Sequence, residues 1–454
     1  MTALAVYLKE KGFAVSGSDV KEKFSTDAIL EENSIPVLTG FNPLHINHNL
    51  RLVVSTGAHG GATNPESLEA KKLKIPFYMH GEYMGIMQKG KFTIAVSGCH
   101  GKTTTASMIA FILKSAGLDP SYAIGTAYIN ELGAAGHCGK SKYLIVEADE
   151  YMTCPLTDPT PRFLWLTPDI GVITNIEFDH PDRYGNLEDI KKVFLDFSDK
   201  VKKNGILLVN LDNPVISEMT DKFPGGNILT YGFSPRAEFR IDKIQRSGMS
   251  TQIRITNKSL FITDLLVNIP GKHNLLNSLC SAIVANLTGL SWKNIRDILK
   301  NYTGCNRRFE LIRRFKNNFL YDDYAHHPSE IRSTLSAFKE RFPGHQLLVI
   351  FQPHTFSRTK SLFADFSASF LKADQVYITD IFPSAREKFD STVSSSMLVR
   401  KMNTLKKNAF YINDKQSALN CLTTALKKTS VIVTMGAGNL NQWHPFLIRF
   451  LKSL

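Results

Sequence analysis

Short runs of β-branched and other apolar residues alternate with amphipathic stretches over most of this chain. A strand, a helix and another strand in this rhythm build a parallel sheet, because the helix carries the chain back to the edge where the next strand begins. The pattern therefore predicts an α/β fold. The predicted strands are FAVSG (13–17), RLVVST (51–56), FTIAVS (92–97), YLIVEA (143–148), IGVITNI (170–176), ILLVNL (206–211), FLYDD (319–323), QLLVIFQ (346–352), QVYITD (375–380) and SVIVT (430–434), and helices between them include 103–116 and 187–203.

The 454 residues exceed what one hydrophobic core fills, so two or three domains are expected. We place the boundaries so that the domains cover 1–90, 91–307 and 308–454. The segment 236–268 alternates apolar and polar residues, which predicts an antiparallel meander inside the middle domain.

The N-terminal stretch conflicts with the usual order of a doubly wound sheet, in which a central strand and a glycine-rich turn precede the first helix. Here the residues directly after Met1, 2–11, already have the pattern of a helix, and the next predicted strand is 13–17. We therefore expect the chain as given to lack that strand and its phosphate-facing turn.

Charge and cysteine content limit the class of partner. The net charge of +13, from 54 Lys and Arg against 41 Asp and Glu, favours an anionic ligand, either nucleic acid or a phosphorylated metabolite. Nucleic acid is not expected, because the basic clusters are short and lack interleaved aromatic residues. The six cysteines form no C-x-x-C pair, which predicts a reducing, cytoplasmic setting. No membrane span is expected, since no window approaches about 18 uninterrupted apolar residues.

The strongest functional motif joins a predicted strand to a predicted helix in FTIAVSGCHGKTTTASMIAFIL. Glycines let backbone N–H groups turn toward a polyphosphate, and a helix N-terminus adds positive potential. The spacing G-x-x-G-K-T is shorter than the common G-x-x-x-x-G-K-[ST] loop, and a plain glycine-rich turn is the alternative. The residues predicted to bind ATP here are Gly98, Cys99, His100, Gly101, Lys102, Thr103 and Thr104.

Acidic residues follow the next two predicted strands of the same domain, in YLIVEADE and VITNIEFDH. Mg²⁺ prefers oxygen ligands, and parallel strands present such side chains at their carboxyl ends. Glu147, Asp149 and Glu150 end the first motif, while Glu177, Asp179 and His180 end the second. The pattern favours metal-assisted phosphoryl transfer, although loop acids are often only solvated.

Four further motifs lie beyond the meander, and a fifth is near the end. They are GKHNLLN (271–277), NRRFE (306–310), YDDYAHHP (321–328), FQPHTFSRT (351–359) and MGAGN (435–439). Asn274 could be only a helix N-cap, and Arg358, which suits a carboxylate, could be only a surface arginine. Zinc is not expected, because the adjacent His326 and His327 lack a third ligand at usual spacing.

Taken in this order, the motifs SGCHGKTTT, EADE, TNIEFDHPD, GKHNLLN, NRRFE, YDDYAHHP, FQPHTFSRT and MGAGN resemble those of the Mur ligases over nearly the whole chain. The resemblance implies three domains: a Rossmann-like N-terminal domain for a UDP-sugar, a central P-loop ATPase, and a Rossmann-like C-terminal domain that carries the incoming amino acid. The similarity is greatest to members that join L-alanine to UDP-N-acetylmuramate in peptidoglycan precursor synthesis. The partners and cofactors implied are UDP-N-acetylmuramate, L-alanine, ATP and Mg²⁺, with a monomer or homodimer.

The resemblance also implies roles for individual residues. Lys102 holds the ATP phosphates, Thr103 and Glu147 bind Mg²⁺, and His180 binds a second Mg²⁺ or the substrate carboxylate. Lys102, His180 and Arg358 are the catalytic residues that it implies. The remaining implied contacts are Asn274 and Asn277 with adenine, Arg308 and Asp323 with the phosphate and ribose of ATP, His354 and Arg358 with the amino acid, and Ser18 and Asp19 with the UDP-sugar.

This sequence departs from the family in three places. Cys99 replaces a threonine, with little expected effect because the backbone forms the cradle. The stretch YMTCPLTDPTPRF after EADE is longer than usual, and only Met1 represents the turn G-x-G-G-x-G-M. The alternatives are a ligase that recycles a whole tripeptide onto the same UDP-sugar, and a nucleotide-binding protein without ligase activity.

Overall fold

The computed structural model describes residues 1–224, 226–383, 387–427 and 429–453. It divides into two compact units. The first contains Met1–Phe178, Arg183–Asn268 and Leu275–Thr303, and the second contains Asp179–Asp182, Ile269–Asn274 and Gly304–Leu454. Within the described part of the chain, no helix has both the length and the apolar character needed to cross a membrane.

The N-terminal part of the first unit holds two separate pairs of parallel strands, β1 with β2 and β3 with β4. Its elements are α1 (Thr2–Glu10), β1 (Gly17–Asp19), α2 (Ser25–Glu32), β2 (Val37–Thr39), β3 (Val53–Ser55), α3 (Pro65–Lys72), β4 (Phe77–Met79) and α4 (His80–Met87). The helix predicted directly after Met1 is confirmed. The strand predicted at 13–17 is wrong except for Gly17, because Phe13 and Val15 pack on the core from an extended segment that pairs with no strand.

A ten-stranded sheet forms the centre of the first unit, in the order β16-β15-β14-β13-β12-β11-β5-β8-β6-β7. Its strands are β5 (Phe92–Ser97), β6 (Ser121–Ile129), β7 (Gly133–His137), β8 (Tyr143–Glu147), β11 (Ile170–Ile173), β12 (Ile206–Asn210), β13 (Asn227–Gly232), β14 (Phe239–Ser247), β15 (Ser250–Asn257) and β16 (Leu260–Val267). The predicted meander is confirmed as β14, β15 and β16, which continue the parallel sheet through β13.

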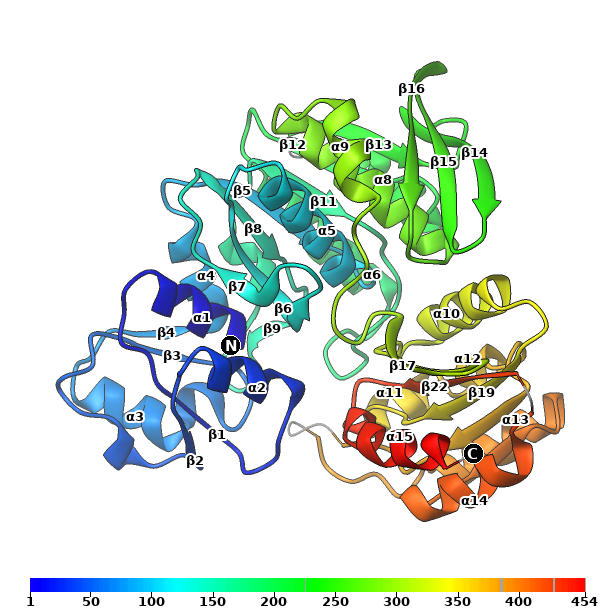
Figure 1. Cartoon of the computed structure of the whole chain (residues 1–454). Coiled ribbons are helices and arrows are strands. Elements are labelled where there is room, and N and C mark those ends of the chain that lie inside the picture. Colours follow the sequence, from blue (N-terminus) through cyan, green and yellow to red (C-terminus); the bar gives the residue numbers. More distant parts are fainter. Residues whose placement is uncertain (225, 384–386, 428, 454) are drawn as a thin grey trace. The chain divides into compact units, whose positions relative to one another are not determined.

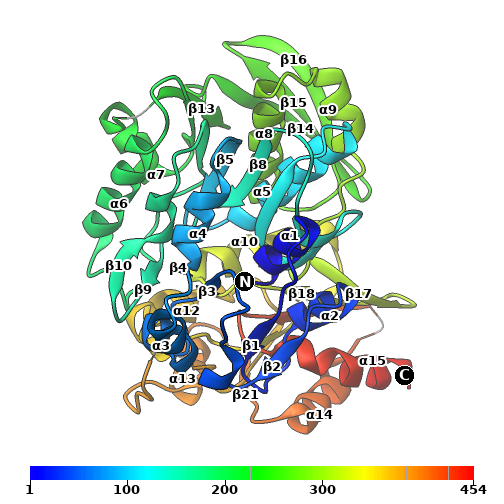
Figure 2. The same ribbon diagram turned by 90° about the vertical axis from the view of Figure 1, so that its left-hand side faces the viewer.

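Helices cover both faces of this sheet (Figures 1 and 2). They are α5 (Lys102–Ser115), α6 (Leu187–Asp199), α7 (Pro214–Met219), α8 (Lys272–Leu287) and α9 (Trp292–Leu299). On one face, Phe194 and Phe197 of α6 share a buried cluster with Ala95 of β5. On the other face, α5 contacts β5 and β8, and its predicted position is confirmed to within one residue at each end.

Helix α1 also packs against β6 and β7, so that the N-terminal part and the central sheet share one core. The approach is close: a Cβ atom at Gly136 of β7 would lie 1.9 Å from the carbonyl oxygen of Ala3. A small hairpin of β9 (Met152–Cys154) and β10 (Asp158–Pro161) stands apart from the main sheet.

The second unit contains a six-stranded sheet in the order β17-β18-β22-β19-β20-β21, parallel except for β17. Its strands are β17 (Glu310–Phe315), β18 (Asn318–Asp323), β19 (Gln346–Phe351), β20 (Gln375–Ile378), β21 (Ala409–Tyr411) and β22 (Ser430–Met435). Its helices are α10 (Pro328–Arg341), α11 (Phe356–Ser361), α12 (Phe363–Ser369), α13 (Ser395–Leu405), α14 (Lys415–Ala425) and α15 (His444–Lys452). All six residues of β19 and of β22 are buried, as expected for central parallel strands.

Candidate active site

The predicted phosphate loop connects β5 to α5, and two of its glycines cannot be replaced without strain. Gly98 and Gly101 have φ values of +127° and +79°, which side chains rarely adopt. A Cβ atom at Gly98 would lie 2.1 Å from Thr174 Oγ1, and one at Gly101 would lie 2.9 Å from Asn277 Oδ1. The loop therefore needs glycine for its backbone shape and for space.

Residues that follow β11 brace this loop. The backbone N–H of His100 donates to Asn175 Oδ1 at 2.8 Å, and Asn175 Nδ2 donates back to the His100 carbonyl at 2.9 Å. Thr174 Oγ1 donates to the same carbonyl at 2.5 Å. Sequence reasoning assigned no individual role to Thr174 or Asn175, although both begin the motif TNIEFDHPD and directly follow a strand that neighbours β5.

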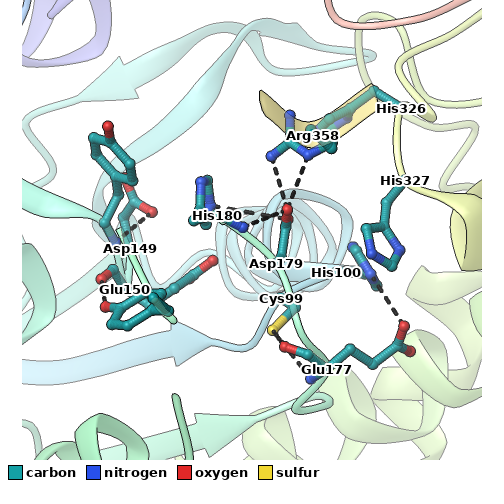
Figure 3. A network of polar contacts seen from close by, with 12 residues as sticks. Cys99, His100, Asp149, Glu150, Glu177, Asp179, His180, His326, His327 and Arg358 are labelled. Carbon is teal, nitrogen blue, oxygen red and sulfur yellow. Dashed lines mark hydrogen bonds and ion pairs between the residues drawn. The ribbon is translucent and has the colours of Figure 1, made fainter. Parts of the chain in front are cut away.

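Cys99 and Glu177 join the loop to the same brace (Figure 3). The Cys99 thiol donates to the Glu177 carbonyl at 3.2 Å, and the Glu177 N–H lies 3.3 Å from the same sulfur. The imidazole of His100 lies 3.6 Å from the Glu177 carboxylate. The buried side chain of Cys99 thus helps to hold the loop in place. The groups available to bind phosphate are still the backbone N–H groups of the loop.

Lys102 begins α5 and folds back over the loop. Its ammonium group donates to the Gly98 carbonyl at 2.6 Å and to the Glu150 carboxylate at 2.8 and 3.1 Å. Burial alone would lower the pKa of Lys102, but the carboxylate of Glu150 and two further acids outweigh burial and raise it. Lys102 is therefore charged at neutral pH and suited to meet a phosphate group.

Thr103 and Glu147, the predicted metal ligands of the first unit, lie side by side. Thr103 Oγ1 donates to the two carboxylate oxygens of Glu147 at 3.0 and 3.1 Å. The N–H of Gly125 also donates to this carboxylate, at 2.8 Å. A hydroxyl and a carboxylate so placed offer the oxygen donors that Mg²⁺ prefers, so these residues fit the ion.

His180, the remaining predicted metal ligand, belongs to the second unit, as do Arg358 and His354. Figure 3 shows His180 and Arg358 on either side of Asp179. Arg358 is buried, and its Nε and Nη2 atoms lie 2.9 and 2.8 Å from Asp179 Oδ1. The N–H of His180 donates to the same oxygen at 2.7 Å. The alternative that Arg358 is a surface arginine is wrong, because α11 places it in a polar cluster made of residues far apart in sequence.

The charges in this cluster are fixed by their neighbours. Burial would raise the pKa of Asp179, but the guanidinium of Arg358 holds it well below its usual range. Burial, and then the neighbouring His326 and Arg358, lower the pKa of His354 well below its usual range. His354 Nδ1 lies 3.3 Å from Arg358 Nη1, so the cluster presents a neutral imidazole beside a cation.

The predicted adenine ligands are both buried on α8, three residues apart and hence on one face of the helix. Asn277 contacts the phosphate loop through its approach to Gly101. Asn274 lies within the helix, where its Nδ2 donates to the Pro270 carbonyl at 2.7 Å. The alternative that Asn274 is the N-cap is therefore wrong.

Arg308 and Asp323, the predicted phosphate and ribose ligands, lie in the second unit. The guanidinium of Arg308 stacks 4.8 Å from the Tyr324 ring centre and lies 3.9 Å from Glu330. Asp323 accepts from the N–H groups of Phe309 and Ala325 at 2.8 and 3.0 Å, and burial raises the pKa of its carboxyl to about 6. The carboxyl of Asp323 thus ties β18 to the residues that follow Arg308.

Ser18 and Asp19, predicted to meet the UDP-sugar, lie on β1. Ser18 Oγ is 3.3 Å from His45 Nδ1, which lies 2.7 Å from the Glu66 carboxylate. Asp19 accepts from the N–H of Val20 at 2.8 Å. These polar contacts of Ser18 and Asp19 are therefore local to the N-terminal part, and both substrate roles remain predictions.

Models of known protein families match three consecutive parts of the chain. Residues 1–91 match the Mur ligase family catalytic domain, 96–285 the Mur ligase middle domain, and 307–438 the Mur ligase glutamate ligase domain. The UDP-N-acetylmuramate--L-alanine ligase of Carboxydothermus hydrogenoformans is 37% identical over 442 residues, covering 97% of this chain and 92% of the relative. The chain belongs to the Mur ligase family. The predicted three-domain Mur ligase architecture is confirmed, while the boundaries near 90 and 308 remain predictions.

Other Mur ligases are also similar. The enzyme of the same name from Clostridium kluyveri is 38% identical, over 97% of this chain and 94% of the relative. The crystal structure of UDP-N-acetylmuramate-alanine ligase MurC from Thermotoga maritima superposes with a TM-score of 0.80 at 24% identity, covering 100% of this chain and 97% of that chain. A murein peptide ligase from Psychrobacter arcticus gives a TM-score of 0.73 at 22% identity, covering 100% and 97%. These two likenesses establish the fold.

Proposed function

We propose that this Mur ligase joins L-alanine to the lactoyl carboxylate of UDP-N-acetylmuramate at the expense of ATP, as a step of peptidoglycan precursor synthesis. The observation that carries the proposal is the near full-length similarity to ligases of that name at 37–38% identity. The six cysteines are free, which supports a reducing setting, and we place the reaction in the cytoplasm.

The phosphate loop supports the first half of the reaction. A carboxylate oxygen of the acceptor attacks the γ-phosphorus of ATP, the bond to the bridging oxygen breaks, and an acyl phosphate and ADP form. Lys102 stabilises the negative charge on the transferred phosphoryl group, and the backbone of Gly98–Gly101 holds the remaining phosphates. Thr103 and Glu147 would hold Mg²⁺, which would neutralise phosphate charge.

The cluster around Arg358 supports the second half. The neutral amine of L-alanine attacks the acyl carbon, the bond to the phosphate oxygen breaks, and the amine proton passes to the released inorganic phosphate as the amide forms. Arg358 binds the carboxylate of the amino acid, which suits a fixed, always charged guanidinium. His354 is neutral, so it does not repel the ammonium group of the incoming amino acid.

The test measures phosphate released by the purified full-length chain with ATP, Mg²⁺ and UDP-N-acetylmuramate. One reaction contains L-alanine and the other the cell-wall tripeptide. We expect release that depends on L-alanine and a product with the mass of the alanyl conjugate. Release that depends only on the tripeptide would transfer the assignment to peptide recycling, and release with neither would refute ligase activity of the chain.

A further inference from the structure

The hairpin β9–β10 begins directly after the acids of the phosphate-loop region. Glu147 ends β8 and contacts Thr103, and Glu150 contacts Lys102 at 2.8 Å, two residues before the hairpin begins at Met152. The hairpin ends at Pro161, and Arg162 follows it. One end of this segment is thus fixed at the predicted site of phosphoryl transfer.

Strand β9 of the hairpin packs against the N-terminal loop that follows β3. A Cβ atom at Gly57 would lie 2.7 Å from the Thr153 carbonyl oxygen, and one at Gly61 would lie 2.5 Å from Cys154 Sγ. The buried sulfur of Cys154 also accepts a hydrogen bond from the backbone of Ala62. Met79 of β4, the strand that pairs with β3, lies in one buried cluster with Cys154 of β9. The hairpin therefore connects the N-terminal part to the phosphate loop within one compact unit.

Arg162 stands where the two ends of the hairpin meet. Its Nη1 lies 2.9 Å from Asp149 Oδ2, and its Nε donates to the Met152 carbonyl at 3.2 Å. Among the described residues, Nη2 has no hydrogen-bond partner. Burial, and then neighbouring positive charges that include Arg162, lower the pKa of His80, which begins α4 in the N-terminal part. The guanidinium of Arg162 is thus held in one orientation by two of its nitrogen atoms, and Nη2 can donate to another group. It lies between the N-terminal part and the phosphate-loop region.

We propose that Arg162 binds an anionic group of the acyl acceptor as that substrate extends from the N-terminal part to the phosphate loop. The proposal rests on the proposed function, in which the acceptor is a UDP-sugar with a carboxylate that must reach the γ-phosphate. Two groups of the acceptor share the required chemistry, its diphosphate and its lactoyl carboxylate. A planar guanidinium held on one side by Asp149 and Met152 presents its remaining edge to either group.

The experiment measures binding of UDP-N-acetylmuramate, UDP-N-acetylglucosamine and ATP to the full-length chain by calorimetry, together with the KM for each substrate of turnover. We expect Arg162→Ala to weaken UDP-N-acetylmuramate about tenfold while ATP changes less than about twofold, and Arg162→Lys to restore part of the loss. Weakening of both UDP-sugars would assign the contact to the diphosphate, because the glucosamine compound lacks the lactoyl carboxylate. Weakening of UDP-N-acetylmuramate alone would assign it to the carboxylate.

Arg183→Ala is the matched control, since Arg183 donates to the Pro159 carbonyl of the same hairpin at 3.3 Å. Unchanged acceptor binding by Arg162→Ala, an equal loss for ATP, or an equal effect of Arg183→Ala would overturn the proposal. The outcome is separable from that of the proposed function. A wild-type chain that binds UDP-N-acetylmuramate without turnover refutes the ligase reaction alone, and an active wild type with an unaffected Arg162 variant refutes the role of Arg162 alone.

Discussion

The phosphate loop and the cluster around Arg358 are positioned by different means. The loop is a contiguous segment whose shape comes from two glycines and from backbone groups braced by Thr174 and Asn175. The cluster is an ion pair between Arg358 and Asp179, 179 residues apart in sequence, and within the described part of the chain the guanidinium contacts the side chains of Asp179 and His354. The comparison teaches that the first site depends on local conformation and the second on buried charge.

The strongest test of the loop is Lys102→Ala, which removes the one side-chain cation of the segment 98–104 apart from histidine. We expect turnover to fall by about a thousandfold, because charge on the transferred phosphoryl group loses its stabilising cation. Steady-state phosphate release measures this change. Lys114→Ala, at the other end of α5 and paired with Asp119, is the control that should retain activity. Equal turnover of the Lys102 variant and the wild type would refute the ATP site.

Asp179→Asn tests the cluster as a buried pair. Removal of one partner leaves the Arg358 charge uncompensated, and we expect a loss of about 3 kcal/mol in the unfolding free energy of the second unit. Because the folded-state pKa of Asp179 is lowered from 3.8, its stabilisation is present above that pH and is lost as the pH falls through the lowered value. Calorimetric melting should therefore show a gap between wild type and variant that closes in acid.

Asp390→Asn is the control for this measurement, since Asp390 pairs with Lys360 of α11 on the surface at 3.0 Å. It should leave the melting temperature nearly unchanged. A gap for Asp179→Asn that widens as the pH falls would contradict the stated charge of the pair.

Gly101→Ala tests the backbone of the loop. We expect a loss of about 2 kcal/mol in stability, because the variant combines an unfavourable φ with a contact to Asn277. Gly117→Ala is matched in φ, at +81°, but a Cβ atom there meets nothing within 4 Å. The difference between the two melting temperatures therefore measures the close approach alone, and equal losses would show that only φ matters.

Arg358→Ala tests the cluster as a substrate site, and its expected effect on substrate binding is the smallest effect considered. We expect the KM for L-alanine to rise about tenfold and the KM for ATP to rise less, because the proposed reaction assigns this charge to the carboxylate of the amino acid. Arg358→Lys keeps the charge opposite Asp179 and separates substrate binding from stability. Equal increases in both KM values would remove the proposed role.

The sequence predicted those elements whose periodicity is strong and whose contacts are local. β5 and α5 lie where the pattern placed them, because a buried strand, a glycine turn and an amphipathic helix follow one another. The strand expected at 13–17 was wrong. Alternation of apolar residues indicates which side chains are buried, but it does not reveal whether another strand lies close enough to form backbone hydrogen bonds.

Those parts of the site that are contiguous in sequence were predictable, and those that join distant segments were not. The phosphate loop could be derived from its own residues, whereas Asp179 could not be paired with Arg358 because nothing in either segment specifies a partner so distant. The brace formed by Thr174 and Asn175 was missed for the same reason. It depends on β11 lying beside β5, an arrangement that only the sheet order reveals.

The ion pair between Lys102 and Glu150 has a consequence for the catalytic cycle. Glu150 is buried, and its carboxylate pairs with the ammonium group of Lys102. The proposed reaction assigns that same ammonium group to the phosphates of ATP. ATP must therefore compete with an internal anion, which weakens ground-state binding without weakening the cradle itself. In the proposed reaction, a return of Lys102 to Glu150 after phosphoryl transfer would favour departure of ADP and phosphate. In the proposed cycle, the Glu150 carboxylate thus competes with the phosphate groups of substrate and product for Lys102. Glu150 therefore influences both the binding of ATP and the release of ADP and phosphate.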